Sequence, residues 1–122
     1  MDVNADAASE HWVICLCAEW CGVCREWRAA FDQAALGHAG VRFAWIDVED
    51  EAAAMGDIDI ETFPTLLVAA AGRPMFFGPV LPAAAGVERL LASVLAPGAA
   101  PTGITVDVDA LFQRLIALLR NS

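Results

Sequence analysis

The sequence predicts an α/β protein with a four-stranded mixed sheet flanked by helices and an extra C-terminal helix. In the first half of the chain, short apolar runs alternate with a helical pattern, and later two apolar runs are separated by only a few residues. Strands joined through a helix are expected to be parallel with a right-handed crossover, whereas strands joined by a short turn form an antiparallel hairpin. Together these connections predict one mixed sheet with helices on its faces.

Sequence signals bound each element of the first half. Residues 11–17 form a short apolar run with β-branched and aromatic members, which is typical of a buried strand. A helical pattern covers residues 22–36 and ends at a glycine-rich break. Residues 41–48 read as a second strand, and residues 49–56 as a short helix. The apolar stripe of the first helix comprises Val23, Trp27, Ala30, Phe31 and Ala34 or Ala35.

A hairpin and a further helix follow. Residues 65–70 and 75–80 are apolar runs with strand character, separated by a predicted turn over residues 71–74. Residues 83–96 have helical spacing of their apolar positions. The predicted sheet therefore has two strands from the crossover unit and two from the hairpin.

The C-terminal part is predicted to be an addition to this domain. Residues 1–96 form the main domain, residues 97–103 a proline-containing linker, and residues 104–122 a segment whose amphipathic pattern spans 107–120. The wide apolar stripe of this last helix must be buried. We expect it to pack on its own domain, with a dimer or partner contact as the alternative.

Composition and charge exclude several functions. The 122 residues carry 16 acidic and 7 basic side chains, a net charge of −9, and every base is an arginine. Binding to nucleic acid is excluded because it needs a basic face, and no lysine is available for Schiff-base chemistry. No apolar run reaches the ~20 residues that span a bilayer, and no signal peptide is recognisable. We expect a soluble cytoplasmic protein, a monomer or weak dimer, without membrane contact.

The cysteines are the strongest functional signal. Cys21, Gly22, Val23 and Cys24 form a C-x-x-C motif where the first predicted strand gives way to a helix. The N–H groups and the dipole of a helix N-terminus favour an anion, so the thiolate of the first cysteine is stabilised and can attack a disulfide. The second cysteine lies one turn later, within reach of the resulting mixed disulfide.

The other two cysteines leave alternatives open. Cys15 and Cys17 are expected to be small buried side chains of the first strand, although Cys17 is close enough to Cys21 in sequence for an alternative regulatory disulfide. All four cysteines could also ligate zinc or an iron–sulfur cluster. We disfavour a metal site because convergence of all four would distort the strand.

The chain resembles the thioredoxin family at two separate motifs in the expected order of elements. These are Ala-Glu-Trp-Cys-Gly-Val-Cys at residues 18–24 and Thr-Phe-Pro-Thr at residues 62–65, followed by a hairpin with Gly72 at its turn. The resemblance implies a thioredoxin-like fold and exchange between a Cys21–Cys24 dithiol and protein disulfides. It implies no cofactor, because the dithiol itself carries two electrons, which a reductase or small thiol must supply.

The resemblance also assigns roles to individual residues. Cys21 would be the attacking thiolate, Cys24 the resolving thiol, and Pro64 a cis-proline whose loop faces the cysteines. The substrate-facing surface implied by the motifs comprises Trp20, Gly22, Val23, Phe63, Pro64 and Thr65.

Departures from the family pattern keep a second function open. Val23 replaces the usual proline between the cysteines, Cys15 stands where the family has a buried acid, and the partner lysine is missing. Of nearby cations only Arg25 and Arg28 remain to assist the thiolate. These departures favour the alternative of a non-catalytic redox sensor or chaperone-like adaptor with a dedicated partner. Seven acids between residues 47 and 61 are further expected to disfavour anionic substrates.

Overall fold

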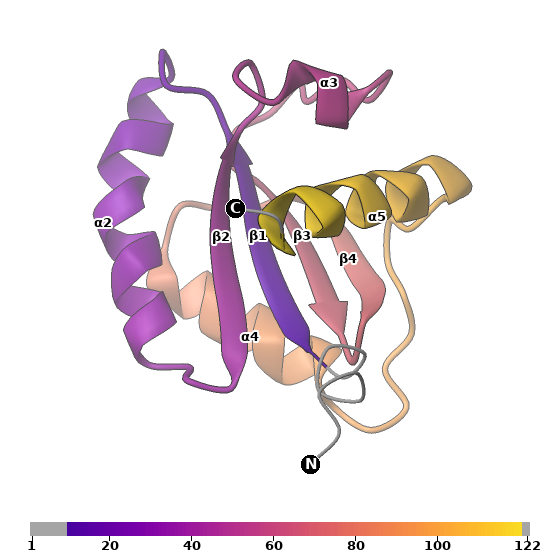
Figure 1. Cartoon of the computed structure of the whole chain (residues 1–122). Coiled ribbons are helices and arrows are strands. Elements are labelled where there is room, and N and C mark those ends of the chain that lie inside the picture. Colours follow the sequence, from indigo (N-terminus) through magenta and orange to yellow (C-terminus); the bar gives the residue numbers. More distant parts are fainter. Residues whose placement is uncertain (1–9, 121–122) are drawn as a thin grey trace.

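The computed structural model describes residues 10–120, and the helices and strands within them alternate as the sequence predicts (Figure 1). In chain order they are β1 (His11–Cys17), α2 (Gly22–Leu36), β2 (Val41–Asp47), α3 (Ala52–Met55), β3 (Thr65–Ala70), β4 (Arg73–Pro79), α4 (Ala84–Val94) and α5 (Val106–Arg120).

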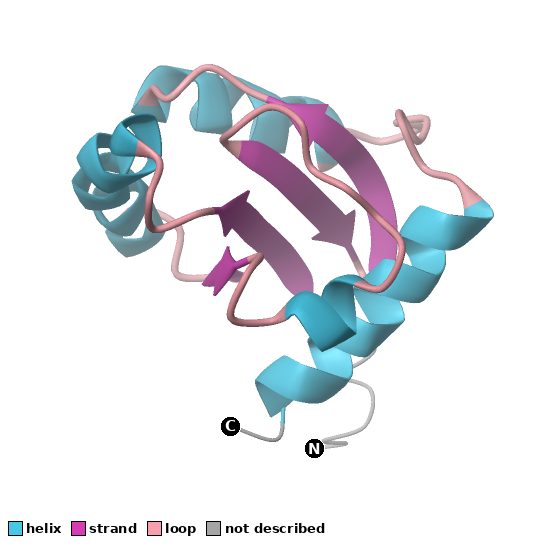
Figure 2. Cartoon of the chain, turned by 90° about the horizontal axis from the view of Figure 1, so that it is seen from above, coloured by secondary structure: helices cyan, strands magenta, loops and turns pink. Residues whose placement is uncertain are grey.

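The four strands form one mixed sheet in the order β2-β1-β3-β4. β1 pairs in parallel with β2, where His11 lies opposite Val41, and antiparallel with β3, which continues into the antiparallel β4. The predicted crossover unit and hairpin are therefore confirmed. Seen from above, helices cover both faces of this sheet (Figure 2).

Each face of the sheet has its own core. Val13, Cys15 and Cys17 of β1 point toward α2 and α4, and we call this side the cysteine face. Ile14 and Leu16, one residue out of phase, point toward α5 on the side that we call the α5 face. Because side chains alternate along a strand, a central strand covered on both faces is apolar at every position. This explains the unbroken apolar run of β1.

The hairpin turn is shorter than the sequence indicates. The turn was predicted over residues 71–74, but β4 already begins at Arg73 and only Ala71 and Gly72 connect the strands. Both have positive φ, 52° at Ala71 and 78° at Gly72, which is the backbone of a tight two-residue hairpin turn. The proline at position 74 suggested a loop, but it is accepted here because β4 is an edge strand.

The segment after α4 runs along the free edge of β4. The Thr102 N–H donates to the Met75 carbonyl at 2.9 Å, and the Phe77 N–H donates to the Thr102 carbonyl at 3.0 Å. Gly103 follows with φ of 75°, and its backbone lies against the Phe77 carbonyl, where no Cβ could fit. The predicted linker thus covers an edge that would otherwise expose unpaired backbone groups.

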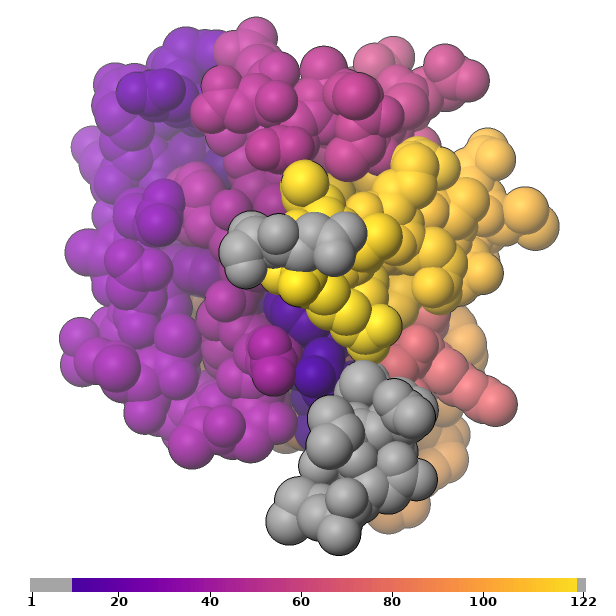
Figure 3. Space-filling model, viewed as in Figure 1, coloured from indigo at the N-terminus to yellow at the C-terminus, as the bar shows by residue number. Residues whose placement is uncertain are grey.

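Helix α5 closes the second face of the sheet. Its side chains Leu111, Phe112 and Leu115 are buried in the core of the α5 face. Arg114 extends from α5 to α3, where its Nε donates to the Ala54 carbonyl at 2.6 Å. In the space-filling view α5, in yellow, lies across the front of the molecule below the α3 segment (Figure 3).

Some predicted details differ. Val23 was placed on the buried stripe of α2 but is 42% exposed, and the buried position of that turn is Cys24. The short helix predicted over residues 49–56 is reduced to α3. Among the residues described, no helix is both long and apolar enough to cross a membrane.

Candidate active site

The predicted active-site motif lies at the carboxyl end of β1, in the turn that leads into α2. Cys21 is the N-cap residue of the helix, with extended backbone angles, and its N–H donates to the Ala18 carbonyl at 3.0 Å. The Cys21 carbonyl accepts the first helical hydrogen bond, from Arg25 at 3.2 Å. The predicted placement of the first cysteine at a helix N-terminus is therefore correct.

Asp47, at the end of β2, anchors this turn. Its carboxylate accepts the Glu19 N–H at 2.9 Å and the Glu49 and Asp50 N–H groups at 2.8 and 3.1 Å. Partial burial acts to raise the pKa of Asp47, but the donors on Asp50, Glu49 and Glu19 outweigh it and hold the pKa below its ordinary value. An ionised Asp47 thus fixes the backbone immediately before Trp20 and Cys21.

The cysteine pairing differs from what the sequence suggests. Cys17, at the end of β1, forms a disulfide with Cys24, whereas Cys21 is a free and partly exposed thiol. The two bonded residues have Cα atoms 5.9 Å apart, within the range for disulfides. The predicted burial of Cys17 is confirmed, because its side chain is fully buried. Its bonding was not predicted: Cys17 pairs with Cys24, which the resemblance assigns to Cys21, and not with Cys21 as the sequence suggested. This pairing depends on tertiary structure, because the first turn of α2 places Cys24 next to Cys17 at the end of β1.

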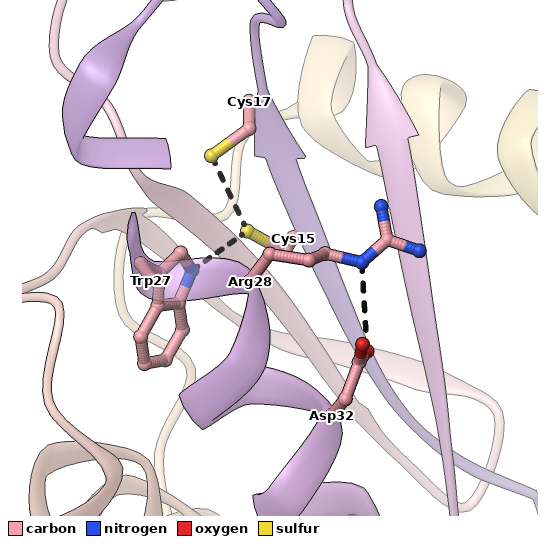
Figure 4. A network of polar contacts seen from close by, with 5 residues as sticks. All are labelled: Cys15, Cys17, Trp27, Arg28 and Asp32. Carbon is pink, nitrogen blue, oxygen red and sulfur yellow. Dashed lines mark hydrogen bonds and ion pairs between the residues drawn. The ribbon is translucent and has the colours of Figure 1, made fainter. Parts of the chain in front are cut away.

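The side chain of Cys15 lies between Cys17 and Trp27, as Figure 4 shows. The Trp27 Nε1 donates to the Cys15 Sγ at 3.3 Å, and the Cys15 thiol lies 3.7 Å from the Cys17 Sγ. Burial raises the pKa of Cys15 to about 12, against smaller opposing effects of the Trp27 hydrogen bond and the Arg28 charge. Cys15 therefore stays a protonated, buried thiol at neutral pH, in agreement with its predicted core role.

The four cysteines do not assemble into a metal site. Two of their sulfur atoms are committed to the Cys17–Cys24 bond. Within residues 10–120, no group of three or more His, Cys, Asp or Glu residues is arranged to hold an ion. The alternative of a four-thiolate centre therefore has no geometric support.

The second motif lies beside the first. The Phe63–Pro64 peptide bond is cis, as the resemblance implies, and Pro64 is buried immediately before β3. The ring of Phe63 meets the ring of Trp20 edge to face, with centroids 5.6 Å apart. Thr65 is buried and its hydroxyl donates to the Thr62 carbonyl at 2.7 Å. The two motifs, about forty residues apart in sequence, therefore share one surface.

Both rings line a groove of about 480 Å³. Trp20 is 63% exposed, and the other lining residues include Glu49, Asp59 and Glu61. None of its lining residues is basic. Part of the acidic segment singled out in the sequence therefore lines a depression next to the candidate site.

The two nearby arginines have other partners. Arg25 donates to the Glu19 carbonyl at 2.8 Å. Arg28 pairs with Asp32 at 3.5 Å, as drawn in Figure 4, and its guanidinium lies 4.6 Å from the centre of the Trp45 ring. Both arginines also line a recess of about 540 Å³ whose lining includes Cys24 and Trp45. Arg25 therefore holds the turn before α2, and Arg28 stabilises the surface of α2 itself.

Two residues of this site were not assigned by sequence reasoning. The sequence predicts Cys17 to be a core side chain with Cys21 as its alternative disulfide partner, and nothing in its spacing indicates a bond to Cys24. Asp47 was noted only as one of seven acids, although its position at the end of a predicted strand parallel to β1 is a usable signal. Parallel strands end at the same edge of a sheet, so a polar residue there lies near the loop that follows its neighbour.

A family comparison agrees with this geometry. The thioredoxin family model matches residues 2–78, more than half of the chain. The chain therefore belongs to the thioredoxin family. Comparison with curated protein sequences gives no match.

Solved structures give the same fold. Thioredoxin from Fasciola hepatica is 23% identical with a TM-score of 0.59, over 74% of this chain and 85% of its own. Oxidised thioredoxin from Plasmodium falciparum is 18% identical with a TM-score of 0.60, over 79% and 94%. Mitochondrial thioredoxin 3 from Saccharomyces cerevisiae is 21% identical with a TM-score of 0.57, over 70% and 80%. These likenesses establish the fold. The family match and the Cys17–Cys24 disulfide together indicate a member of the thioredoxin family that can carry out redox chemistry.

Proposed function

We propose that the protein is a thiol–disulfide oxidoreductase that acts on protein disulfides with Cys21 as nucleophile. The observation that carries this proposal is the position of Cys21: a free, partly exposed thiol at the N-terminus of α2. Trp20 and Phe63 beside it form an apolar platform of the kind that receives a peptide.

The proposed reaction moves two electrons and needs no cofactor. In the fully reduced protein, the Cys21 thiolate attacks one sulfur of a substrate disulfide, a mixed disulfide forms, and the other substrate sulfur leaves as a thiolate. The Cys24 thiolate then attacks Cys21, the Cys21–Cys24 bond forms, and the substrate leaves with both sulfurs reduced. Gly22 and Val23 separate the two cysteines, and Pro64 with Thr65 shape the opposite loop. A reductase or small thiol would return the electrons.

The acidic groove supports a preference among substrates. Glu49, Asp59 and Glu61 line it, and the whole chain has a net charge of −9. Like charges repel an approaching anion, so a neutral or cationic polypeptide disulfide is favoured over glutathione disulfide. The cytoplasmic location stays a prediction from the sequence.

Insulin reduction in the presence of dithiothreitol tests the proposal. We expect wild-type protein to accelerate precipitation of the insulin B chain and the Cys21→Ser variant to lose this activity to the uncatalysed background. The Cys15→Ser variant is the matched control and should retain activity, because Cys15 is buried and protonated. Full turnover by Cys21→Ser would refute the assignment of the nucleophile.

A second function is favoured by one specific observation. The disulfide of the structure joins Cys17 to Cys24, so the C-x-x-C pair itself is not closed. A redox sensor or chaperone-like adaptor that holds one dedicated partner would use such a form. Slow insulin turnover together with tight binding of a partner in only one redox form would favour the sensor over the catalyst.

A further inference from the structure

Cys24 has two cysteines near it with which it could form a disulfide bond, Cys17 and Cys21. Cys24, in the first turn of α2, is bonded to Cys17 at the end of β1. Cys21 lies three residues before Cys24 at the N-cap, a spacing that places two side chains on the same side of a helix. Cys21 also packs against the buried cluster that contains Cys17 and Cys24. Either Cys17 or Cys21 can therefore be the partner of Cys24.

We propose that Cys17 is a third redox residue, which exchanges with Cys21 for the bond to Cys24. In the exchange, the Cys21 thiolate attacks the Cys24 sulfur, a Cys21–Cys24 bond forms and the Cys17–Cys24 bond breaks. The electron pair leaves with Cys17, which takes up a proton. In the reverse step Cys17 loses this proton, its thiolate attacks the Cys24 sulfur, the Cys17–Cys24 bond forms again and Cys21 leaves as the thiolate. No net oxidation occurs, so no other reactant is needed.

The two isomers differ in what they present to a substrate. With Cys21–Cys24 bonded, the remaining thiols are Cys15 and Cys17, and both positions are fully buried. With Cys17–Cys24 bonded, Cys21 is a free thiol at the surface although the protein is oxidised. That isomer can capture a further disulfide, but Cys24 is not available to release it. Cys17 thus decides whether oxidised protein releases or retains a partner, an inference that rests on the proposed role of Cys21.

Cys15 cannot take the place of Cys17 or Cys21, although its sulfur is 3.7 Å from that of Cys17. Nucleophilic attack requires a thiolate, and the Cys15 thiol is buried and holds its proton to about pH 12. It also accepts a hydrogen bond from Trp27. Cys15 is therefore a matched control: a cysteine in the same cluster that takes no part in the exchange.

The test follows both disulfides during alkylation of native protein. The purified full chain is oxidised until each molecule has one disulfide and is then incubated with excess N-ethylmaleimide. Samples are taken over time into acid and denaturant, which stop the exchange. Protease Glu-C cleaves after Glu10, Glu19 and Glu26, so it places Cys17 in peptide 11–19 and both Cys21 and Cys24 in peptide 20–26. A Cys17–Cys24 bond joins the two peptides, whereas a Cys21–Cys24 bond stays inside the second. Mass spectrometry reads the two products separately.

We expect alkylation of the native protein to convert the Cys21–Cys24 isomer into the Cys17–Cys24 isomer. Maleimide reacts irreversibly with Cys21 only in the Cys17–Cys24 isomer, so exchange should convert internally bonded peptide into joined peptide that carries one maleimide on Cys21. The total disulfide stays constant, and Cys15→Ser should behave as wild type. An oxidised wild type that keeps either linkage alone throughout, or a mixture that never converts, would overturn the proposal.

Two variants complete the test. Cys21→Ser, which changes a partly exposed side chain, should still form the joined peptides, and their absence would contradict the Cys17–Cys24 bond. Cys17→Ser should form only the internal bond and show no conversion, with Cys17→Ala and circular dichroism as checks on folding. No substrate is present, so the outcome is separate from that of the insulin assay. If the isomers interconvert but the protein does not reduce insulin, only the catalytic proposal is refuted. If the protein reduces insulin but the isomers do not interconvert, only the proposed exchange is refuted.

Discussion

The two faces of the sheet are built on different principles. The α5 face is closed by apolar side chains of a helix that comes last in the chain, and its contacts are those of ordinary packing. The cysteine face is closed by α2 and α4, and there one covalent bond joins the sheet to a helix terminus. The same strand, β1, supplies both faces with alternate side chains.

This difference separates stability from chemistry within a small domain. Redox change on the cysteine face makes or breaks a bond at the first turn of α2, while the packing of α5 on the other face involves no titrating or redox group in its core. We therefore expect substitutions on the α5 face to change the free energy of unfolding with little effect on the reactivity of Cys21. Substitutions around Cys21 should do the reverse.

The largest stability effect is expected on the α5 face. Leu115→Ala removes a fully buried side chain and should lower the free energy of unfolding by about 2–5 kcal/mol, measured by urea denaturation. Gln113→Ala, on the exposed side of the same helix, should change it by no more than about 0.5 kcal/mol. Equal effects of the two variants would contradict the packing of α5 on the sheet.

A smaller effect is expected where the chain crosses the edge of β4. Gly103 has φ of 75°, and a side chain in that region costs roughly 1–2 kcal/mol before any contact is counted. Gly103→Ala should cost at least this much, since its Cβ would collide with the Phe77 carbonyl. Gly40→Ala is the control, because a Cβ there meets nothing within 4 Å and the backbone needs no positive φ. Thermal unfolding of the two variants measures the difference, and equal midpoints would contradict the account.

Asp47 allows a prediction about pH on the cysteine face. Its pKa is lowered in the folded protein, so its stabilising effect is present above the ordinary value of 3.8 and is lost as pH falls through the folded value. Asp47→Ala removes the acceptor of three backbone N–H groups and should cost about 1 kcal/mol at neutral pH. Wild type and variant should converge in acid. A difference that persists undiminished in acid would contradict an electrostatic role.

The last prediction concerns the chemical reactivity of Cys15, with no change in stability expected. Burial raises its pKa to about 12, so iodoacetamide should leave native Cys15 unmodified from pH 7 to about pH 10 while it modifies Cys21. In denatured protein Cys15 loses its proton near the ordinary value of 9.0 and should react readily. Peptide mapping of the alkylated sites measures both. Modification of native Cys15 at the rate of Cys21 would show that it is accessible.

Local patterns were enough for the sheet, its helices and the position of Cys21. An unbroken apolar run predicts a strand buried on both faces, and a strand followed by C-x-x-C and a helical pattern predicts an N-cap cysteine. The Cys17–Cys24 bond was not predictable in this way. Four cysteines allow six different pairs for a single disulfide, and the choice depends on how the end of β1 faces the first turn of α2. The start of β4 was missed because Ala71, a residue that disfavours positive φ, takes that conformation in the turn.

The most direct test of the central claim is a covalent trap with the Cys24→Ser variant. Without Cys24 neither internal disulfide can form, and a mixed disulfide at Cys21 cannot be resolved by the usual partner. Incubation with a disulfide-containing peptide and digestion with Glu-C should place the adduct, reversible by dithiothreitol, on peptide 20–26 at Cys21. An adduct on peptide 11–19 at Cys17, or no adduct at all, would contradict the account.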